Sequence, residues 1–175
     1  MTLTSQNAHA PESWLSRHRW VIPAAVVLLL DQVTKISIER VTRAGDVHAI
    51  IPGLLNLVHT RNTGMAFSFF AEFDPAIVRP ILIAFSVATI GLVIWFLRMP
   101  GSARPTTWGL SLVLGGAVGN LADRILRGSV FDFIDAHIGV HHWPAFNLAD
   151  SAITIGAALV IWDLLFAREA RAVRL

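Results

Sequence analysis

The chain has 175 residues, of which 54% are hydrophobic and only 15% are charged, and its mean hydropathy is +0.60. Soluble domains carry about 25% charged residues, so this composition predicts a single domain whose main solvent is lipid. The net charge of +2, without a basic run, argues against a nucleic-acid partner. The absence of Cys excludes disulfides, thiolate metal sites and a Cys nucleophile.

The first apolar segment covers residues 20–38 and follows a polar tail at 1–16 that we expect to be disordered. The basic residues Arg17 and Arg19 precede the segment, in the manner of a signal peptide. However, Asp31 interrupts it and no small-residue cleavage site follows. Residues 20–38 are therefore predicted to be a retained membrane-spanning helix.

Three further segments are long and apolar enough to span a membrane, which takes about 20 mostly apolar residues. We expect these spans at about 78–97, 105–124 and 147–166. The first two each contain 18 successive residues without a charge, whereas Asp150 interrupts the third. Together with the first segment, they predict a mainly α membrane protein with four transmembrane helices.

Four spans place both termini on one side of the membrane. The connection at 98–104 is short and basic, as is the end of the chain at 169–175. Dense positive charge beside spans favours the cytoplasm. We therefore expect one integral membrane domain at 17–168 with two cytoplasmic tails, at 1–16 and 169–175.

Two segments then face outward, at about 40–76 and 125–146. The first contains HAIIPGLLNLVHT, which is rich in β-branched residues and is punctuated by Gly and Pro. This composition favours short strands, so we expect a small extracytoplasmic β platform between the first and second transmembrane helices. The same segment is apolar enough to lie on the membrane surface.

A charge inside a span costs about 2.5 kcal/mol or more, so the acids and bases of the spans are candidates for function. Asp31 and Lys35 lie at i and i+4, with the acid first, which is the favourable order for a helical ion pair. They are either a self-neutralising pair that orients the first helix or a support for a reactive residue nearby.

The third span ends in GNLADR, which places Asn120, Asp123 and Arg124 on one helical face. The glycines at 115–119 allow another helix to approach closely. This group is either a structural helix end, with a salt bridge and an interhelical hydrogen bond, or part of a site.

Two acids stand at the outward membrane boundary. Asp132 lies between two Phe, and Asp150 opens the fourth span three residues after Asn147. Asn147 and Asp150 could simply cap that helix, but capping does not explain Asp132. Two partly desolvated carboxylates can share a proton. One can then take a proton from water while the other polarises a scissile carbonyl, as in an aspartic hydrolase that needs no metal or cofactor.

Three histidines, His137, His141 and His142, lie in one loop between these acids. No neighbouring carboxylate has the spacing of a metal ligand set. We therefore expect no metal site here.

The chain resembles the bacterial lipoprotein signal peptidases, also called type II signal peptidases, from Trp20 to about Trp162. The resemblance rests on five blocks in order: Asp31-Gln32-Val33-Thr34-Lys35, Arg61-Asn62-Thr63-Gly64-Met65-Ala66-Phe67, Gly119-Asn120-Leu121-Ala122-Asp123-Arg124, Val130-Phe131-Asp132-Phe133 and Phe146-Asn147-Leu148-Ala149-Asp150-Ser151. Each block is weak by itself, but five in order in a four-span protein of this size are highly specific.

The resemblance implies that Asp132 and Asp150 are the catalytic pair, whereas the nearby Asp135 lies outside its block. It also implies that eight residues bind substrate or support the pair: Asp31, Lys35, Asn62, Gly64, Asn120, Asp123, Arg124 and Asn147.

The same resemblance implies the activity. These enzymes remove the signal peptide from prolipoproteins by cleaving before a diacylglyceryl-modified cysteine. The expected setting is the bacterial inner membrane, with the site at the periplasmic face, membrane lipids as partners and a monomeric enzyme.

Two other functions are less well supported by the sequence. A proton- or solute-coupled transporter would be expected to show inverted repeats of broken helices, and none is visible. In addition, the acids gather at one face instead of crossing the bilayer. A scaffold subunit with structural acids predicts no catalytic loss when Asp132 or Asp150 is replaced.

Overall fold

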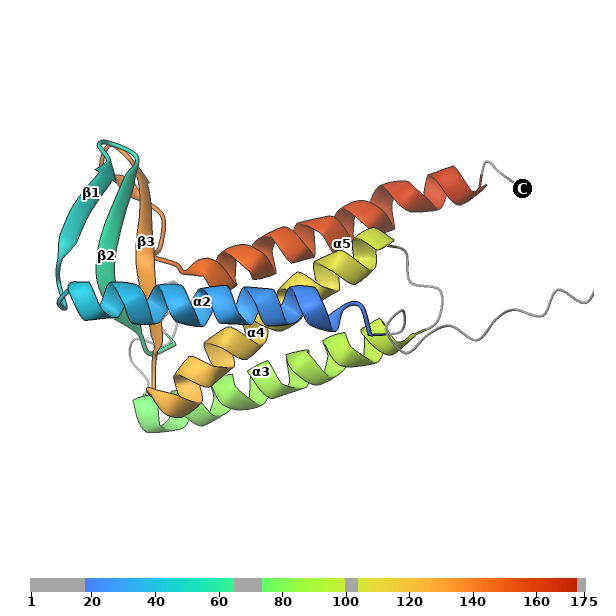
Figure 1. Ribbon diagram of the computed structural model, residues 1–175, viewed down its shortest axis with the longest axis horizontal. Helices are drawn as coiled ribbons and strands as arrows, with labels where there is room; N and C mark the ends of the chain where they lie inside the picture. The colour runs from blue at the N-terminus through green and yellow to red at the C-terminus, as the bar shows by residue number, and fades with distance from the viewer. Residues whose placement is uncertain (1–17, 65–73, 100–103, 173–175) are drawn as a thin grey trace, which may run out of the picture.

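The computed structural model describes residues 18–64, 74–99 and 104–172 of the chain. Four long helices form a bundle, and a small sheet lies across one end of it (Figure 1). All four helices are long and apolar enough to cross a membrane, which confirms the predicted four-span architecture. The helices are α2 (Val21–Val41), α3 (Pro75–Arg98), α4 (Arg104–Leu126) and α5 (Leu148–Ala172).

Some sequence predictions fall outside the described residues. The tail at 1–16 does so, as does the stretch Met65–Phe67 of the second block. At the other end of the chain, α5 continues to Ala172, so helix extends past residue 166, where we expected the fourth span to end. The helix α3 begins at a local signal, because the carboxylate of Asp74 accepts a hydrogen bond from the backbone N–H of Ala76 at 2.8 Å.

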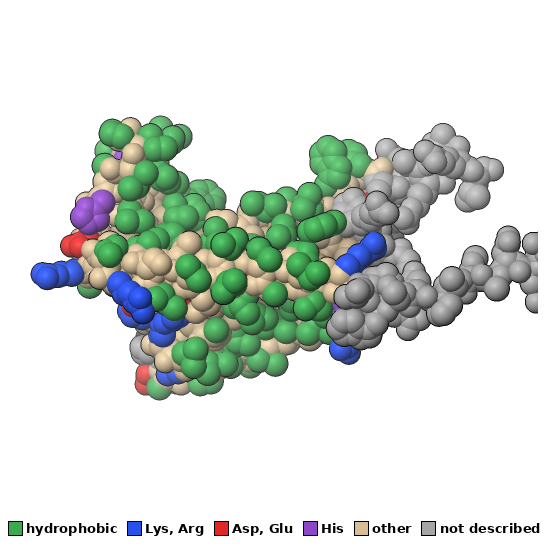
Figure 2. All heavy atoms as spheres, viewed as in Figure 1, with side chains coloured by type: hydrophobic (Ala, Val, Ile, Leu, Met, Phe, Trp, Pro, Cys, Tyr) green, Lys and Arg blue, Asp and Glu red, His purple; other side chains and the backbone are tan. Residues whose placement is uncertain are grey.

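The bundle has polar residues inside and apolar residues outside. Asp31 and Lys35 of α2 are completely buried, whereas Leu29 of the same helix and Phe85 of α3 are 64% and 71% exposed. Figure 2 shows hydrophobic side chains over the length of the bundle and charged side chains near its two ends. This distribution is what a bilayer demands, because lipid favours apolar side chains and penalises exposed charge.

Tryptophans mark the end of the bundle that lies away from the sheet. Trp95, Trp108 and Trp162 are each more than half exposed there, and Trp20 directly precedes α2. Trp is enriched where a protein passes from hydrocarbon to the headgroup region. The protein is therefore a multi-pass membrane protein with a membrane–water interface at this level.

The central helix is α4, which packs on α2, α3 and α5. Glycines bring these helices into backbone contact, as the glycine cluster predicted. A Cβ atom on Gly156 of α5 would lie 2.4 Å from the carbonyl oxygen of Gly109 in α4. A Cβ atom on Gly116 of α4 would lie 2.4 Å from the carbonyl oxygen of Ala149 in α5. Small residues at such positions are the usual basis of tight helix packing in membranes.

The change Gly156→Ala is expected to destabilise the protein by about 1–3 kcal/mol, because the new methyl group forces α4 and α5 apart. Gly91→Ala in α3 is the matched control, since a Cβ there meets nothing within 4 Å. Its effect should be a stabilisation of up to about 1 kcal/mol from the higher helix propensity of Ala. Thermal unfolding in detergent measures both, and equal midpoints for the two variants would contradict this packing.

The sheet is antiparallel, with strands in the order β1-β2-β3-β4. Its first two strands come from the connection between α2 and α3, as predicted. The other two come from the connection between α4 and α5, where no strands were predicted. The strands are β1 (Val47–Ile51), β2 (Leu55–Asn62), β3 (Val130–Ile138) and β4 (His141–His142).

Candidate active site

Asp132 and Asp150 lie where the sheet meets the bundle. Asp132 is in β3 and is 2% exposed, beside the buried rings of Phe131 and Phe133. Asp150 lies in the first turn of α5. The two predicted catalytic acids thus come from successive elements that the fold brings to one end of the bundle.

Two asparagine amides join the two carboxylates. Asn147 donates from Nδ2 to Asp132 Oδ1 at 2.7 Å and to Asn120 Oδ1 at 3.3 Å. Asn120 donates from its own Nδ2 to Asp150 Oδ1 at 2.7 Å. The path from one acid to the other therefore runs Asp132–Asn147–Asn120–Asp150 and links β3, α4 and α5.

Asn147 and Asp150 also form the helix cap that we weighed as a structural alternative. The N–H of Asp150 donates to Asn147 Oδ1 at 3.0 Å, and the N–H of Asn147 donates to Asp150 Oδ2 at 3.2 Å. This reciprocal pattern is a capping box. It holds the Asp150 carboxylate in one orientation, so the helix cap and the candidate site share these two residues.

The second oxygen of Asp132 faces Asn62, at the end of β2. Asn62 Nδ2 donates to Asp132 Oδ2 at 3.1 Å, and Asn62 Oδ1 accepts from the N–H of Gly64 at 2.9 Å. Gly64 has a φ of +112°, and a Cβ there would lie 2.2 Å from Leu82 Cδ1 in α3. Glycine is thus favoured at this position by its backbone conformation, and a side chain there would also require Leu82 to move.

The environment of Asp132 favours its protonated form. Burial, with the nearby charge of Asp150, raises the pKa of Asp132 to about 6, although hydrogen bonds from Asn62 and Asn147 act in the opposite direction. A carboxyl group with this pKa can hold or release a proton near neutral pH.

Lys35 lies beneath the two amides in a fully buried ion-pair cluster. Its Nζ is 2.9 Å from Asp31 Oδ2, 2.7 Å from Asp123 Oδ2 and 3.0 Å from Asn120 Oδ1. An ammonium group has three donors and no acceptor. The oxygen of the Asn120 amide must therefore face Lys35, which leaves its NH₂ group to face Asp150. The Asp31–Lys35 pair is thus neutralised in the interior, with Asp123 as a third member, and Lys35 contacts Asn120. Its support of a reactive residue stays a prediction.

Asp31 also ties α2 to the start of α5. Its Oδ1 accepts a hydrogen bond from the N–H of Ala149 at 3.0 Å. A Cβ on Gly119 would lie 2.7 Å from Asp31 Oδ2, so this glycine lets the carboxylate reach the interior of the bundle.

Arg127 belongs to the same cluster, although it was not among the predicted site residues. It pairs with Asp123 and donates to Gln32 Oε1 at 3.1 Å, and Gln32 Nε2 in turn donates to Asp123 Oδ1 at 3.2 Å. The i, i+4 spacing of Asp123 and Arg127 could have revealed it. Among the ion pairs of the described residues, Asp123 binds Lys35 and Arg127 and not Arg124, which corrects the alternative of an Asp123–Arg124 salt bridge.

Arg124 lies beside the pair with a donor to spare. Its Nη1 donates to the carbonyl oxygen of Asn120 at 3.3 Å. Its Nε is buried and has no hydrogen-bond partner among the residues that the structure describes. Asp150 and Asp132 act on the guanidinium electrostatically. A buried, unsatisfied donor beside two carboxylates is suited to bind a carbonyl group of a ligand.

Asp135 is held elsewhere in the sheet. It accepts hydrogen bonds from Asn56 Nδ2 at 2.9 Å and pairs with His142 Nδ1 at 2.8 Å. Burial raises its pKa, but the hydrogen bonds from Asn56 and His142 outweigh burial, so the pKa lies below the ordinary value. Because side chains alternate along a strand, Asp132 and Asp135 point to opposite faces of β3.

The three histidines of the β3–β4 region form no metal site within the described part of the chain, where no group of three metal-binding side chains is found. His142 pairs with Asp135, and the ring of His137 stacks on the ring of His142 at a centroid distance of 4.6 Å.

Four spanning helices, a small sheet and an amide-bridged carboxylate pair between them define a multi-pass membrane protein with a candidate hydrolytic site. Comparison with known proteins agrees. The sequence model of the family described as Signal peptidase (SPase) II matches residues 23–166. The chain therefore belongs to the signal peptidase II family.

Curated relatives carry the name lipoprotein signal peptidase. Those of Paraburkholderia phymatum and a Janthinobacterium strain are each 47% identical over 144 residues, which is 82% of this chain and 86% of theirs. The relative from Geobacter metallireducens is 43% identical over 145 residues, which is 82% of this chain and 88% of the relative. A solved structure, described as a bacterial membrane enzyme determined by the in meso method, is 33% identical, with a TM-score of 0.75 over 85% of this chain and 88% of that one.

Proposed function

We propose that the protein is an aspartic endopeptidase that removes the signal peptide from bacterial prolipoproteins, cleaving before the diacylglyceryl-modified cysteine. Membership of the signal peptidase II family supports a peptidase acting on prolipoproteins. The observation that carries the aspartic mechanism is the amide bridge between two carboxylates at the membrane boundary, Asp132 and Asp150.

In the proposed reaction the two acids share one proton. The ionised carboxylate takes a proton from a water molecule, and the resulting hydroxide attacks the scissile carbonyl, which the protonated carboxyl polarises. The tetrahedral intermediate then breaks its C–N bond as a proton passes to the nitrogen. The products are a signal peptide with a new carboxylate and a lipidated cysteine with a free α-amino group.

The other polar residues have supporting roles in this proposal. Asn147 and Asn120 hold the carboxylates in place, and Lys35 orients the Asn120 amide. Asn62 constrains the second oxygen of Asp132. Arg124 is the donor that we assign to a backbone carbonyl of the substrate near the scissile bond, and because its Nε is buried, the side chain must turn to reach that carbonyl.

The position of the site suits a lipidated substrate. A signal peptide carries an apolar segment that can lie in the bilayer beside the spans, and its acylated cysteine would lie at the membrane surface. Asp150 stands at the start of a span and Asp132 just outside one. All ten proposed site residues come from one chain, so a monomer suffices.

We also propose the orientation expected from the sequence, in the inner membrane with the site at the periplasmic face and both termini in the cytoplasm. The two described ends of the chain, at the start of α2 and the end of α5, both lie at the end of the bundle away from the sheet (Figure 1). Arg19 and Arg98 lie at this end, in agreement with the positive-inside rule.

The purified protein should cleave a diacylglyceryl-modified prolipoprotein in detergent and should leave the same substrate without the lipid uncut. A gel shift follows the reaction, and mass spectrometry of the product identifies its first residue, which we expect to be the modified cysteine. Cleavage at another bond, or equal cleavage of the two substrates, would contradict the proposed specificity.

The cleavage rate should fall as the pH rises, because the pair works only while it holds its shared proton. For Asp132, with a pKa of about 6, the proton is present below this pH and is lost above it. Asn62→Ala removes a hydrogen bond that favours the ionised form, so the alkaline limb of kcat/KM against pH should move to higher pH. The matched control, Asn56→Ala, removes a donor to Asp135 and should leave the limb in place. A shift to lower pH in Asn62→Ala would contradict the assignment.

A further inference from the structure

An apolar groove lies between α2 and α3, in the half of the bundle away from the sheet, with a volume of about 220 Å³. Its floor is α4, on which both helices pack. The groove opens on the lipid-facing side of the bundle, and almost no polar atoms line it. Its lining includes Ala25 and Leu28 of α2, Ile90 and Ile94 of α3, and Leu114 and Val118 of α4.

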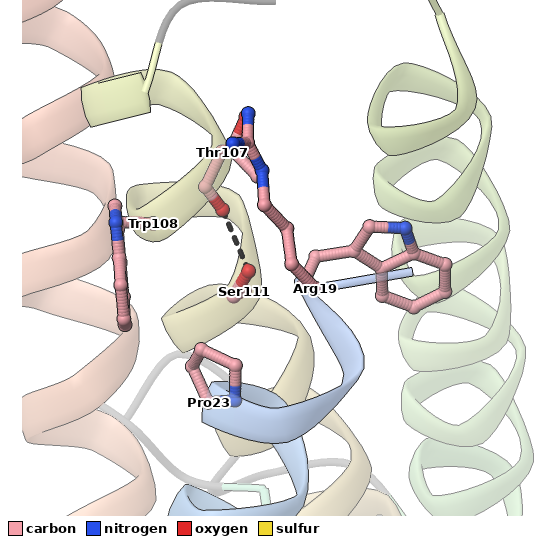
Figure 3. A pocket seen from close by; sticks show the side chains of 6 residues that line it. Arg19, Pro23, Thr107, Trp108 and Ser111 are labelled. Atoms are coloured by element: carbon pink, nitrogen blue, oxygen red, sulfur yellow. Dashed lines mark hydrogen bonds between the residues drawn. The ribbon is translucent and has the colours of Figure 1, made fainter. Parts of the chain in front are cut away.

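A second cavity, of about 230 Å³, lies at the ends of α2 and α4 and is partly polar. Figure 3 shows Arg19, Pro23, Thr107, Trp108 and Ser111 around it. Trp20 lines both the cavity and the groove, so the two spaces are neighbours. The cavity, called the mouth below, is partly polar and lies at the level of the Trp residues, whereas the groove is apolar and includes residues deeper in the bundle.

The charge at this mouth is positive. Arg19 is exposed and forms no ion pair with any residue in the described ranges. Arg98 lies at the same end, at the last turn of α3, but does not line the mouth, so Arg19 is the cation that defines its charge. Asp163, the acid at this end whose side chain the structure describes, is buried and accepts a hydrogen bond from Thr106. The mouth therefore attracts anions at the depth where lipid headgroups lie.

We propose that one anionic phospholipid binds at this place, with an acyl chain in the groove and its phosphate on Arg19. The apolar lining matches the acyl chain, the interfacial Trp residues lie at the level of the headgroup region, and Arg19 matches the phosphate. A signal-peptide segment is a poorer match, because its own basic start would be placed beside Arg19 and Arg98. This lipid site does not depend on the proposed peptidase activity, since it lies at the opposite end of the bundle from Asp132.

Native mass spectrometry of the full-length protein tests the headgroup half of the proposal. Dioleoylphosphatidylglycerol and dioleoylphosphatidylcholine are added in competition to the protein in detergent. We expect about fivefold tighter binding of the anionic lipid, the factor for about 1 kcal/mol per basic residue near the surface. Arg19→Gln should remove the preference, and the matched control Arg98→Gln, at the same end but outside the cavity lining, should keep it. Equal binding of the two lipids, or a preference that survives Arg19→Gln, overturns the proposal.

A second pair of variants tests the groove. Ala25→Phe places a ring in the groove and should weaken both lipids, whereas Val26→Phe, on an exposed neighbouring position that does not line it, should not. Unchanged lipid binding in Ala25→Phe identifies general lipid contact and overturns the proposal. A synthetic peptide with a basic start and an apolar core provides a second test. If this peptide displaces the lipid and Ala25→Phe weakens binding of the peptide, the groove serves the substrate and the proposal is overturned.

Discussion

Asp132→Asn and Asp150→Asn are each expected to lower the rate of prolipoprotein cleavage by about 10³-fold or more, since each removes one half of a proton-transferring pair. The replacement keeps the shape of the side chain, and its carbonyl oxygen can still accept the amide hydrogen bond that Asn147 or Asn120 now gives. Its NH₂ group replaces the second oxygen, which accepts from Asn62 in the case of Asp132 and from the N–H of Asn147 in the case of Asp150. Each variant should therefore lose one hydrogen bond, at a cost of about 1–3 kcal/mol, and still fold. The loss is measured by gel shift of a lipidated prolipoprotein with purified enzyme, alongside thermal unfolding in detergent.

The matched control for this experiment is Asp135→Asn in the same strand. Asp135 is bound to Asn56 and His142 on the other face of β3, so its variant should cleave at close to the normal rate. Normal cleavage by either Asp132→Asn or Asp150→Asn would sink the assignment of the pair and favour a purely structural role for these acids. Loss in Asp135→Asn alone would show that the other acid of β3 is the catalytic one.

Lys35→Met is expected to destabilise the protein by about 3–5 kcal/mol, the usual result of breaking a buried ion pair by removing one partner. Lys35 is the fully buried cation between Asp31 and Asp123. Without it, two carboxylates remain in the interior with only Arg127, which is partly exposed, to balance them. The Asn120 amide would also lose the donor that orients it, so activity should fall with stability. Thermal unfolding in detergent measures the first effect and the cleavage assay the second.

Two controls separate the buried charge from a general loss of a cation. Arg98→Met removes an exposed charge at the far end of α3 and should leave the unfolding midpoint unchanged. Lys35→Met combined with Asp31→Asn leaves Asp123 paired with Arg127, so no carboxylate stays uncompensated. This double variant should recover much of the lost stability, although not the orientation of Asn120. A single Lys35→Met variant that unfolds at the normal temperature would rule out the ion-pair cluster as a source of stability.

Much of the fold could be predicted because membrane insertion depends on local composition. Each span needs about 20 apolar residues in succession, and this property is readable without knowing any contact. The β3 strand escaped prediction for the opposite reason. Its residues Val130–Phe133 are all buried, so they show no alternation of apolar and polar side chains, and its partner β2 lies about 70 residues earlier in the chain.

The proposed site divides in the same way. Family motifs and the cost of charge in lipid identified Asp132, Asp150 and their polar neighbours, and their catalytic roles stay predictions until the variants are measured. Arg127 was missed because it belongs to none of the five motif blocks. Its role in the cluster depends on Gln32, which lies 95 residues away in sequence.

By itself, the sequence determined the class of solvent, the number of spans and the set of polar residues that lipid could not surround. Only the tertiary structure decided which of their atoms pair: Lys35 with Asp123 as well as Asp31, Asn147 with Asp132, and Asn120 with Asp150. The physical reason is range. The cost of placing a charge in a bilayer belongs to each residue separately, whereas a hydrogen bond has a length and a direction, which exist only once α2, α4, β3 and α5 are packed together.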